Sequence, residues 1–208
     1  GTEEKISTVS KTEYGIPEGV SVYDLRITAV DDRNDESPSS RIRHPRAVKI
    51  GVQPVYFVPM GKIMTAMFEP GYGATAYLGL RNFFMQNIEL GISGGAVMLP
   101  GTDTEKVDSM LFAPVTFDAG YHFAMGEFFS VMPCVSLGFA YMELEYKSAA
   151  IPKNRSSFEP VGRAGAMVNY EFEYLQLSAG ASYGFIYETS GLKPFVEVYI
   201  RAGAIIDL

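Results

Sequence analysis

The chain has 208 residues, of which 47% are apolar, 13% aromatic and 20% charged, with a formal net charge of −7. This composition is too apolar for a disordered chain, and its acidic balance without a basic cluster argues against a nucleic-acid partner. The sequence also lacks the roughly 18 consecutive apolar residues that a membrane helix needs, which excludes a helical membrane protein.

Residues 1–46 are polar, and 31–46 read DDRNDESPSSRIRHPR, a charged stretch rich in turn formers. Residues 20–30 could form one short strand. We therefore predict a polar N-terminal arm or partial plug over 1–46. No signal peptide is visible, and a chain that opens Gly-Thr-Glu-Glu is expected to have lost an export signal by processing.

From residue 47 to 208 the dominant pattern is alternation with period two, which predicts strands with unlike faces. A helical pattern over 61–67 is too short to change this. We predict eight strands, long against the usual five or six residues. They cover 47–60, 68–81, 87–99, 110–123, 128–142, 158–171, 175–187 and 193–208.

The connections between these strands differ in length. Those after the second, fourth and sixth strands are tight, whereas those after the third and fifth are long and polar. Tight turns at one end and long loops at the other are typical of an up-and-down antiparallel meander.

One face of every predicted strand carries no charged or amide side chain, as Val48, Ile50 and Val52 illustrate on the first. The opposite face is polar and holds 12 of the 21 glycines. Aromatic residues gather on the apolar face toward the strand ends: Tyr56, Tyr72, Tyr121, Phe123, Phe129, Tyr141, Phe158, Tyr170 and Tyr187.

A soluble sandwich or lipocalin-like barrel would show the same alternation with its apolar face inward. Three features favour the opposite orientation. The glycines lie on the polar face, where a narrow lumen leaves little volume. Acids and bases are nearly balanced there, as paired interior charges should be. Aromatic rings mark both rims, as in membrane barrels. The sequence therefore predicts an all-β, eight-stranded up-and-down antiparallel transmembrane β-barrel over 47–208, with an apolar exterior and a polar lumen.

With its eight alternating runs, aromatic rims and a last strand that reaches the C-terminus as RAGAIIDL, the segment 47–208 resembles the small outer-membrane barrels of Gram-negative bacteria. These are the OmpW-like, OmpX-like and OmpA transmembrane-domain families. The final Leu208 departs from the aromatic residue with which such barrels typically end. The long strands are most similar to the OmpW type, and that resemblance implies passage of small hydrophobic molecules.

Charged residues of the polar face could meet across the lumen. They would form either a gate in a narrow pore or a plug of salt bridges, and we favour the plug. The residues that we assign to this lumen network are Lys49, Glu89, Asp118, Arg163, Glu197 and Arg201.

Catalytic residues are not expected. Lipid A deacylases of this size use a His and a Ser on the lipid-facing side, whereas His122 falls on the lumen face, His44 in the arm, and the lipid face has no Ser. Cys134 lies on the lumen face beside Met132 and Met142. A copper(I) site is conceivable there, but packing is favoured, so we expect no metal and no cofactor.

The expected function is that of a non-enzymatic, monomeric barrel in the bacterial outer membrane, with lipid as its surroundings. It would be a porin-like transport route for small or hydrophobic solutes. Two alternatives remain open: a structural or adhesive surface barrel with a closed lumen, and a soluble lipocalin-like carrier. The long loops 102–109 and 143–157 are where surface contacts would form.

Overall fold

The structure is a computed structural model that describes residues 46–102, 107–126, 128–147, 155–189 and 191–208. The expected arm or plug, with its short strand and His44, lies outside these residues except for Arg46. The compact unit that contains the barrel covers His44–Leu208.

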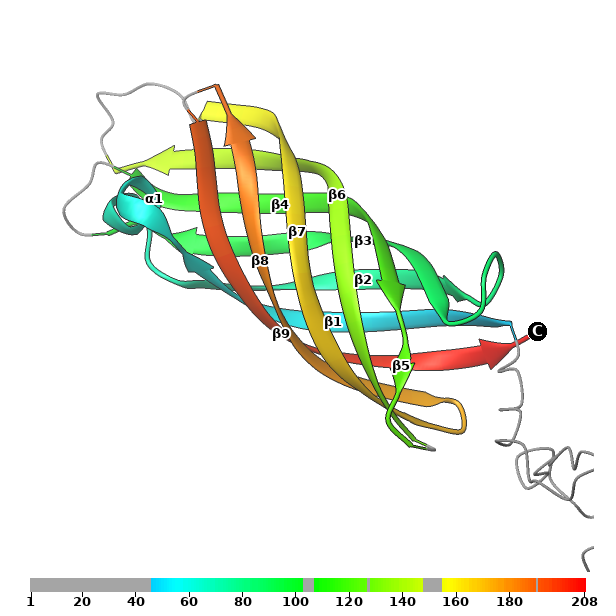
Figure 1. Cartoon of the computed structure of the whole chain (residues 1–208). Coiled ribbons are helices and arrows are strands. Elements are labelled where there is room, and N and C mark those ends of the chain that lie inside the picture. Colours follow the sequence, from blue (N-terminus) through cyan, green and yellow to red (C-terminus); the bar gives the residue numbers. More distant parts are fainter. Residues whose placement is uncertain (1–45, 103–106, 127, 148–154, 190) are drawn as a thin grey trace, which may run out of the picture. The chain divides into compact units, whose positions relative to one another are not determined.

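The predicted antiparallel barrel is confirmed (Figure 1). The sheet order is β4-β3-β2-β1-β9-β8-β7-β6-β5, and pairing of β4 with β6 closes it. The strands are β1 (Ala47–Pro59), β2 (Gly71–Arg81), β3 (Ile88–Pro100), β4 (Val107–Tyr121), β5 (Phe123–Ala124), β6 (Phe129–Tyr146), β7 (Arg155–Phe172), β8 (Leu175–Glu188) and β9 (Gly191–Asp207).

One of the eight predicted strands is interrupted. The backbone N–H of His122 donates to the carbonyl of Asn87 at 2.8 Å, and the chain then resumes as β5, which pairs with β6. Both β4 and β5 pair with β6, so β5 continues the path of β4. The barrel wall is therefore eight strands around.

The two faces of the wall have opposite chemistry. Apolar side chains such as Phe117 and Leu137 are 70% and 67% exposed on the outside, whereas Lys49 and Glu89 are each 1% exposed inside. Burial of charge under an exposed apolar surface is the reverse of a water-soluble protein and suits a wall that faces hydrocarbon. The described residues contain no helix that is long and apolar enough to cross a membrane.

The two ends of the barrel differ. One, the turn end, has the connections 82–87, 125–128 and 173–174. There Asn82, Asn87 and Glu173 have φ of 61°, 64° and 49°, a left-handed conformation that Asn tolerates better than most residues. The loop end has the connections 60–70, 101–106, 147–154 and 189–190.

At the loop end, residues 61–67 form the short helix α1 (Gly61–Met67). The helical pattern of these seven residues is too short to predict a helix from sequence. The helix exists because tertiary packing supports it: Met64 is buried in the apolar cluster of the barrel interior.

Aromatic rings pair on the outer wall near both ends. Tyr56 and Tyr72 have ring centroids 4.9 Å apart near the loop end, and Tyr121 and Phe123 are 4.8 Å apart near the turn end. Two such bands, with apolar side chains between them, match the interfacial girdles of a membrane barrel.

Candidate functional site: the barrel interior

The interior toward the turn end is organised around Glu89. Its carboxylate accepts hydrogen bonds from Lys49 Nζ at 2.7 Å and from Tyr77 Oη at 2.6 Å, and it lies 2.8 Å from His122 Nε2. Arg201 Nη1 is 3.8 Å away. A single buried carboxylate thus contacts two cations and orients two further polar side chains.

This cluster, which we call the Glu89 cluster, extends toward the turn end through Glu171. Lys49 Nζ also donates to Glu171 at 2.7 Å, and Arg81 pairs with the second oxygen of the same carboxylate. The cluster therefore contains Lys49, Arg81, Glu89, Glu171 and Arg201, with Tyr77 and His122 as hydrogen-bonding partners.

Glycines make room for the largest members of this cluster. Gly79 and Gly91 are register partners on β2 and β3. A Cβ on Gly91 would lie 2.6 Å from Tyr77 Cε2, so the Tyr77 ring lies over these two residues. The guanidinium of Arg201 in turn lies 3.7 Å from the centroid of that ring, a cation–π contact.

A second ion-pair group, the Arg163 cluster, lies farther toward the loop end. Arg163 Nη1 donates to Glu197 at 2.8 Å, and Nη2 donates to Thr116 Oγ1 at 2.7 Å. Asp118 lies 3.6 Å from Nη2, and Ser93 also accepts from it at 3.3 Å. Arg163 is 9% exposed, and its guanidinium is held by two acids and two hydroxyls.

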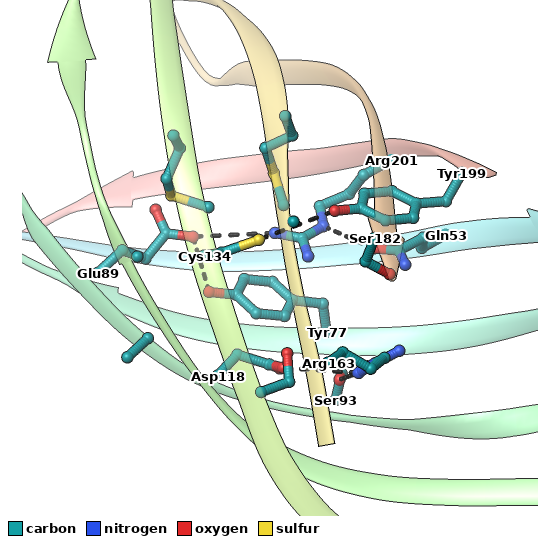
Figure 2. A pocket seen from close by; sticks show the side chains of 16 residues that line it. Gln53, Tyr77, Glu89, Ser93, Asp118, Cys134, Arg163, Ser182, Tyr199 and Arg201 are labelled. Atoms are coloured by element: carbon teal, nitrogen blue, oxygen red, sulfur yellow. Dashed lines mark hydrogen bonds and ion pairs between the residues drawn. The ribbon is translucent and has the colours of Figure 1, made fainter. Parts of the chain in front are cut away.

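A small cavity lies between the two clusters (Figure 2). It measures about 30 Å³ and is lined by members of both, including Glu89, Asp118, Arg163 and Arg201. Asp118 Oδ2 and Arg201 Nη1 are buried without a hydrogen-bond partner within the described residues. A space of this size holds about two water molecules.

Beyond the Arg163 cluster, toward the loop end, the interior becomes apolar. The rings of Phe57 and Phe195 stack with centroids 4.5 Å apart, and Phe112 lies 5.3 Å from Phe57. All three are fully buried. We call these rings the Phe cluster. Val55, Leu99, Met110 and Met64 of α1 pack in the same group and fill the lumen here with side chains.

The structure places all six residues of the predicted lumen network inside the barrel, but in two groups. Lys49, Glu89 and Arg201 belong to the Glu89 cluster, whereas Asp118, Arg163 and Glu197 form the Arg163 cluster. The prediction omitted Arg81, Glu171, His122 and Tyr77, although their positions on the inward face were visible in the alternation. It also treated the whole lumen as polar and so did not include the Phe cluster.

Ser130, His122 and Glu89 form a hydrogen-bonded chain: Ser130 Oγ lies 3.2 Å from His122 Nδ1, and Nε2 contacts Glu89. The connectivity is that of a nucleophile, a base and an orienting acid. Ser130 Oγ, however, also accepts from Asn169 Nδ2 at 3.2 Å, and His122 is buried in the wall of the lumen. In the part of the chain that the structure describes, no three His, Cys, Asp or Glu side chains are grouped so that they could hold a metal ion.

No family model and no curated protein sequence matches the chain. Solved structures do match. Neisserial surface protein A has a TM-score of 0.54 at 14% identity over 78% of this chain and 99% of its own. Ail, the attachment invasion locus protein of Yersinia pestis, has a TM-score of 0.50 at 14% identity over 79% and 100%.

A major outer membrane protein from Thermus thermophilus has a TM-score of 0.51 at 12% identity, over 76% of this chain and 99% of its own. At these identities the likeness concerns the fold. Together with the closed eight-stranded wall and its apolar outer surface, it leads to one conclusion. The chain has the fold of the small eight-stranded β-barrels of the bacterial outer membrane.

Proposed function

We propose that the protein is a monomeric, non-enzymatic barrel of the outer membrane with a closed lumen. Its wall anchors it in lipid, and its loop end is presented at the cell surface, as the short-turn and long-loop asymmetry of such barrels implies. Of the functions considered from the sequence, we thus choose the surface barrel with a closed lumen over a transport route.

The observation that carries the proposal is the filling of the lumen by two different kinds of packing. Phe57, Phe112 and Phe195 occupy the loop-end part, and the Glu89 and Arg163 clusters occupy the rest. The cavity between the two ion-pair clusters measures about 30 Å³, and a second one at the turn end, beside Arg81 and His122, measures about 40 Å³. Ligand sites usually measure about 300–1,000 Å³, so a carried hydrophobic solute has no room here.

The attachment and surface roles printed for Ail and Neisserial surface protein A belong to those proteins. We extend to this chain only the general role of presenting a loop end at the surface. Support comes from the lengths of β6 and β7, each 18 residues, against the roughly 9–11 residues with which a tilted strand crosses the hydrocarbon core. Strands of this length carry the wall beyond the membrane at the loop end.

The absence of catalysis is also part of the proposal. Ser130 is held by two interior partners, and the pocket that it lines together with His122 measures only about 40 Å³, which is too small for an ester substrate. We expect purified protein to hydrolyse p-nitrophenyl acetate and long-chain p-nitrophenyl esters no faster than the Ser130→Ala variant. Faster hydrolysis by the wild type would contradict this part.

The main test is ion and solute flux. The chain is refolded in detergent, and the folded form is identified by its faster gel migration before boiling. It is then placed in planar bilayers and in liposomes. We expect background conductance and no swelling with small sugars. Stable channel openings would overturn the closed lumen and support the narrow-channel hypothesis. A chain that stays soluble without detergent would overturn the membrane location itself.

A matched pair of variants sharpens this test. Phe57→Ala with Phe112→Ala removes the apolar filling, and Arg163→Ala with Glu197→Ala removes the central ion pair. Because the Glu89 cluster still fills the turn-end part, neither double variant nor the four changes together should conduct. Adding Lys49→Ala with Glu89→Ala to the four changes should open the lumen to ions.

A further inference from the structure

Sulfur atoms are concentrated inside this barrel. Five of the ten methionines are buried in the interior cluster, and Cys134, the one cysteine of the chain, packs against the same cluster. Three of these six residues, Met132, Cys134 and Met167, line the cavity between the two ion-pair clusters. The buried Met142, which the sequence placed beside Cys134, is not among the residues that line it.

Strand register brings the three sulfur side chains together. Met132 on β6 and Met167 on β7 are direct cross-strand partners, and both are 3% exposed. Cys134 follows Met132 by two residues, so its side chain leaves β6 on the same, inward face. Two thioethers and one thiol therefore meet on one patch of the inner wall.

Glycine leaves room for a methionine sulfur beside the thiol. Gly120 on β4 is the register partner of Cys134. A Cβ on Gly120 would lie 2.7 Å from Met132 Sδ, so the methionine sulfur occupies the place where a side chain would be. Cys134 keeps partial exposure, and its Sγ is 3.9 Å from Tyr199 Oη (Figure 2). The thiol thus lies next to open volume.

The same cavity contains buried polar atoms of both charges, Asp118 Oδ2 and Arg201 Nη1, that have no hydrogen-bond partner within the described residues. The formal charges of the four ionised residues that line the cavity, Glu89, Asp118, Arg163 and Arg201, cancel. A monovalent ion bound to a thiolate would add no net charge, whereas a divalent ion would leave an uncompensated buried charge, which is costly.

From this donor set we propose that Cys134, Met132 and Met167 form a site for a soft monovalent metal ion, copper(I) or silver(I). Thiolate and thioether ligands select such ions over harder ones. Binding replaces the thiol proton: the S–H bond of Cys134 breaks, a sulfur–metal bond forms, and one proton leaves for each ion taken up. The proposal revises the sequence-based expectation of no metal, and it does not depend on whether the lumen conducts.

The test uses the full chain refolded in detergent and titrated with silver nitrate in a chloride-free buffer. Bound silver is measured by elemental analysis after gel filtration, and proton release is measured in weak buffer. We expect one ion and one proton per chain, protection of Cys134 from maleimide, and no displacement by excess zinc(II). Copper(I), supplied with ascorbate and a competing chelator, should bind with the same stoichiometry.

Variants separate the site from an ordinary thiol. Cys134→Ser should abolish binding. Met132→Leu with Met167→Leu, which conserves volume, should lower silver affinity by about tenfold or more, since even loss of an outer-shell partner costs that much at many metal sites. Met98→Leu is the matched control, because Met98 is 49% exposed on the outer wall, and it should change nothing.

The gel shift on boiling shows whether each variant has folded, and the single Met167→Leu variant replaces the double variant if that one does not fold. Wild-type protein that takes up no silver overturns the proposal. It is equally overturned if the folded methionine variants bind silver as tightly as wild type, because the thiol alone would then account for binding.

Discussion

The two halves of the barrel interior are filled with side chains of opposite chemistry. Toward the turn end, Lys49 and Glu89 are fully buried as an ion pair at 2.7 Å. Toward the loop end, Phe57 and Phe195 are fully buried as stacked rings at 4.5 Å. Both arrangements fill the interior with buried side chains. Substitutions should affect the stability of the two halves differently. The stability of a buried ion pair depends on both partners, whereas that of an apolar filling depends mainly on side-chain volume.

The largest effect should come from removing the central acid of the ionic half. Glu89→Ala leaves Lys49 and Arg201 buried with too little negative charge, and breaking a buried pair in this way costs about 3–5 kcal/mol. We expect the free energy of unfolding in urea, measured in lipid vesicles, to fall by that amount. The gel shift should then be lost at a lower temperature.

The control is to remove the pair together. Lys49→Met with Glu89→Leu takes away both charges, and exchange of a buried pair for apolar residues is often neutral. This double variant should be more stable than Glu89→Ala alone. A double variant that is less stable would show that the remaining contacts of Lys49, not charge balance, control this half.

A charge placed on the opposite side of the same wall should have the next largest effect. Val135 is 53% exposed on the outside of β6, so Val135→Arg should cost about 2–4 kcal/mol if it lies near the midplane of the bilayer. Asp108→Arg, at an exposed position at the loop-end start of β4, is the control and should cost far less. Equal costs at the two positions would argue that hydrocarbon does not cover the barrel.

The barrel could be predicted because the sequence pattern that specifies it is local and repeated. Each strand alternates apolar and polar side chains, and eight such strands are improbable by chance. The inside-out orientation followed from glycines and aromatic rims rather than from hydropathy. What the alternation could not show is that β4 is interrupted at His122, since that depends on a backbone hydrogen bond to Asn87 across the neighbouring turn.

The interior was less predictable because it depends on register between distant strands. Lys49 and Glu171 are 122 residues apart and meet only because β1 and β7, three strands apart in the closed wall, send these side chains into the same narrow lumen. The inward positions of Phe57, Phe112 and Phe195 were readable from the alternation. Their stacking was not, since it requires knowing that β1, β4 and β9 bring these rings to the same height. The role of residues 1–46 as an arm or partial plug stays a prediction.

A smaller change tests one hydrogen bond of the ionic half without altering its charge. Tyr77→Phe keeps the ring beneath Arg201 but removes the hydroxyl that donates to Glu89 at 2.6 Å. Hydrogen bonds to charged groups contribute about 1.5–3 kcal/mol, and urea unfolding should show a loss in that range. Tyr183→Phe, on the exposed outer face, should be nearly neutral. If Tyr77→Phe is also neutral, Lys49 and His122 alone suffice to hold the carboxylate.

The smallest effect is expected in the apolar half. Phe112→Leu removes ring area but keeps an apolar side chain that can repack against Phe57 and Phe195, and such exchanges usually cost less than about 1.5 kcal/mol. Phe112→Asn is the matched polar variant and should cost more, because Phe112 packs against the rings of Phe57 and Phe195, which offer a buried amide no hydrogen-bond partner. Urea unfolding of the two variants in vesicles measures the difference. If Phe112→Leu lowers the free energy of unfolding as much as Glu89→Ala does, the stability of the ring cluster depends on each ring as strongly as that of the ion pair depends on each charge. The contrast between the two halves would then be wrong.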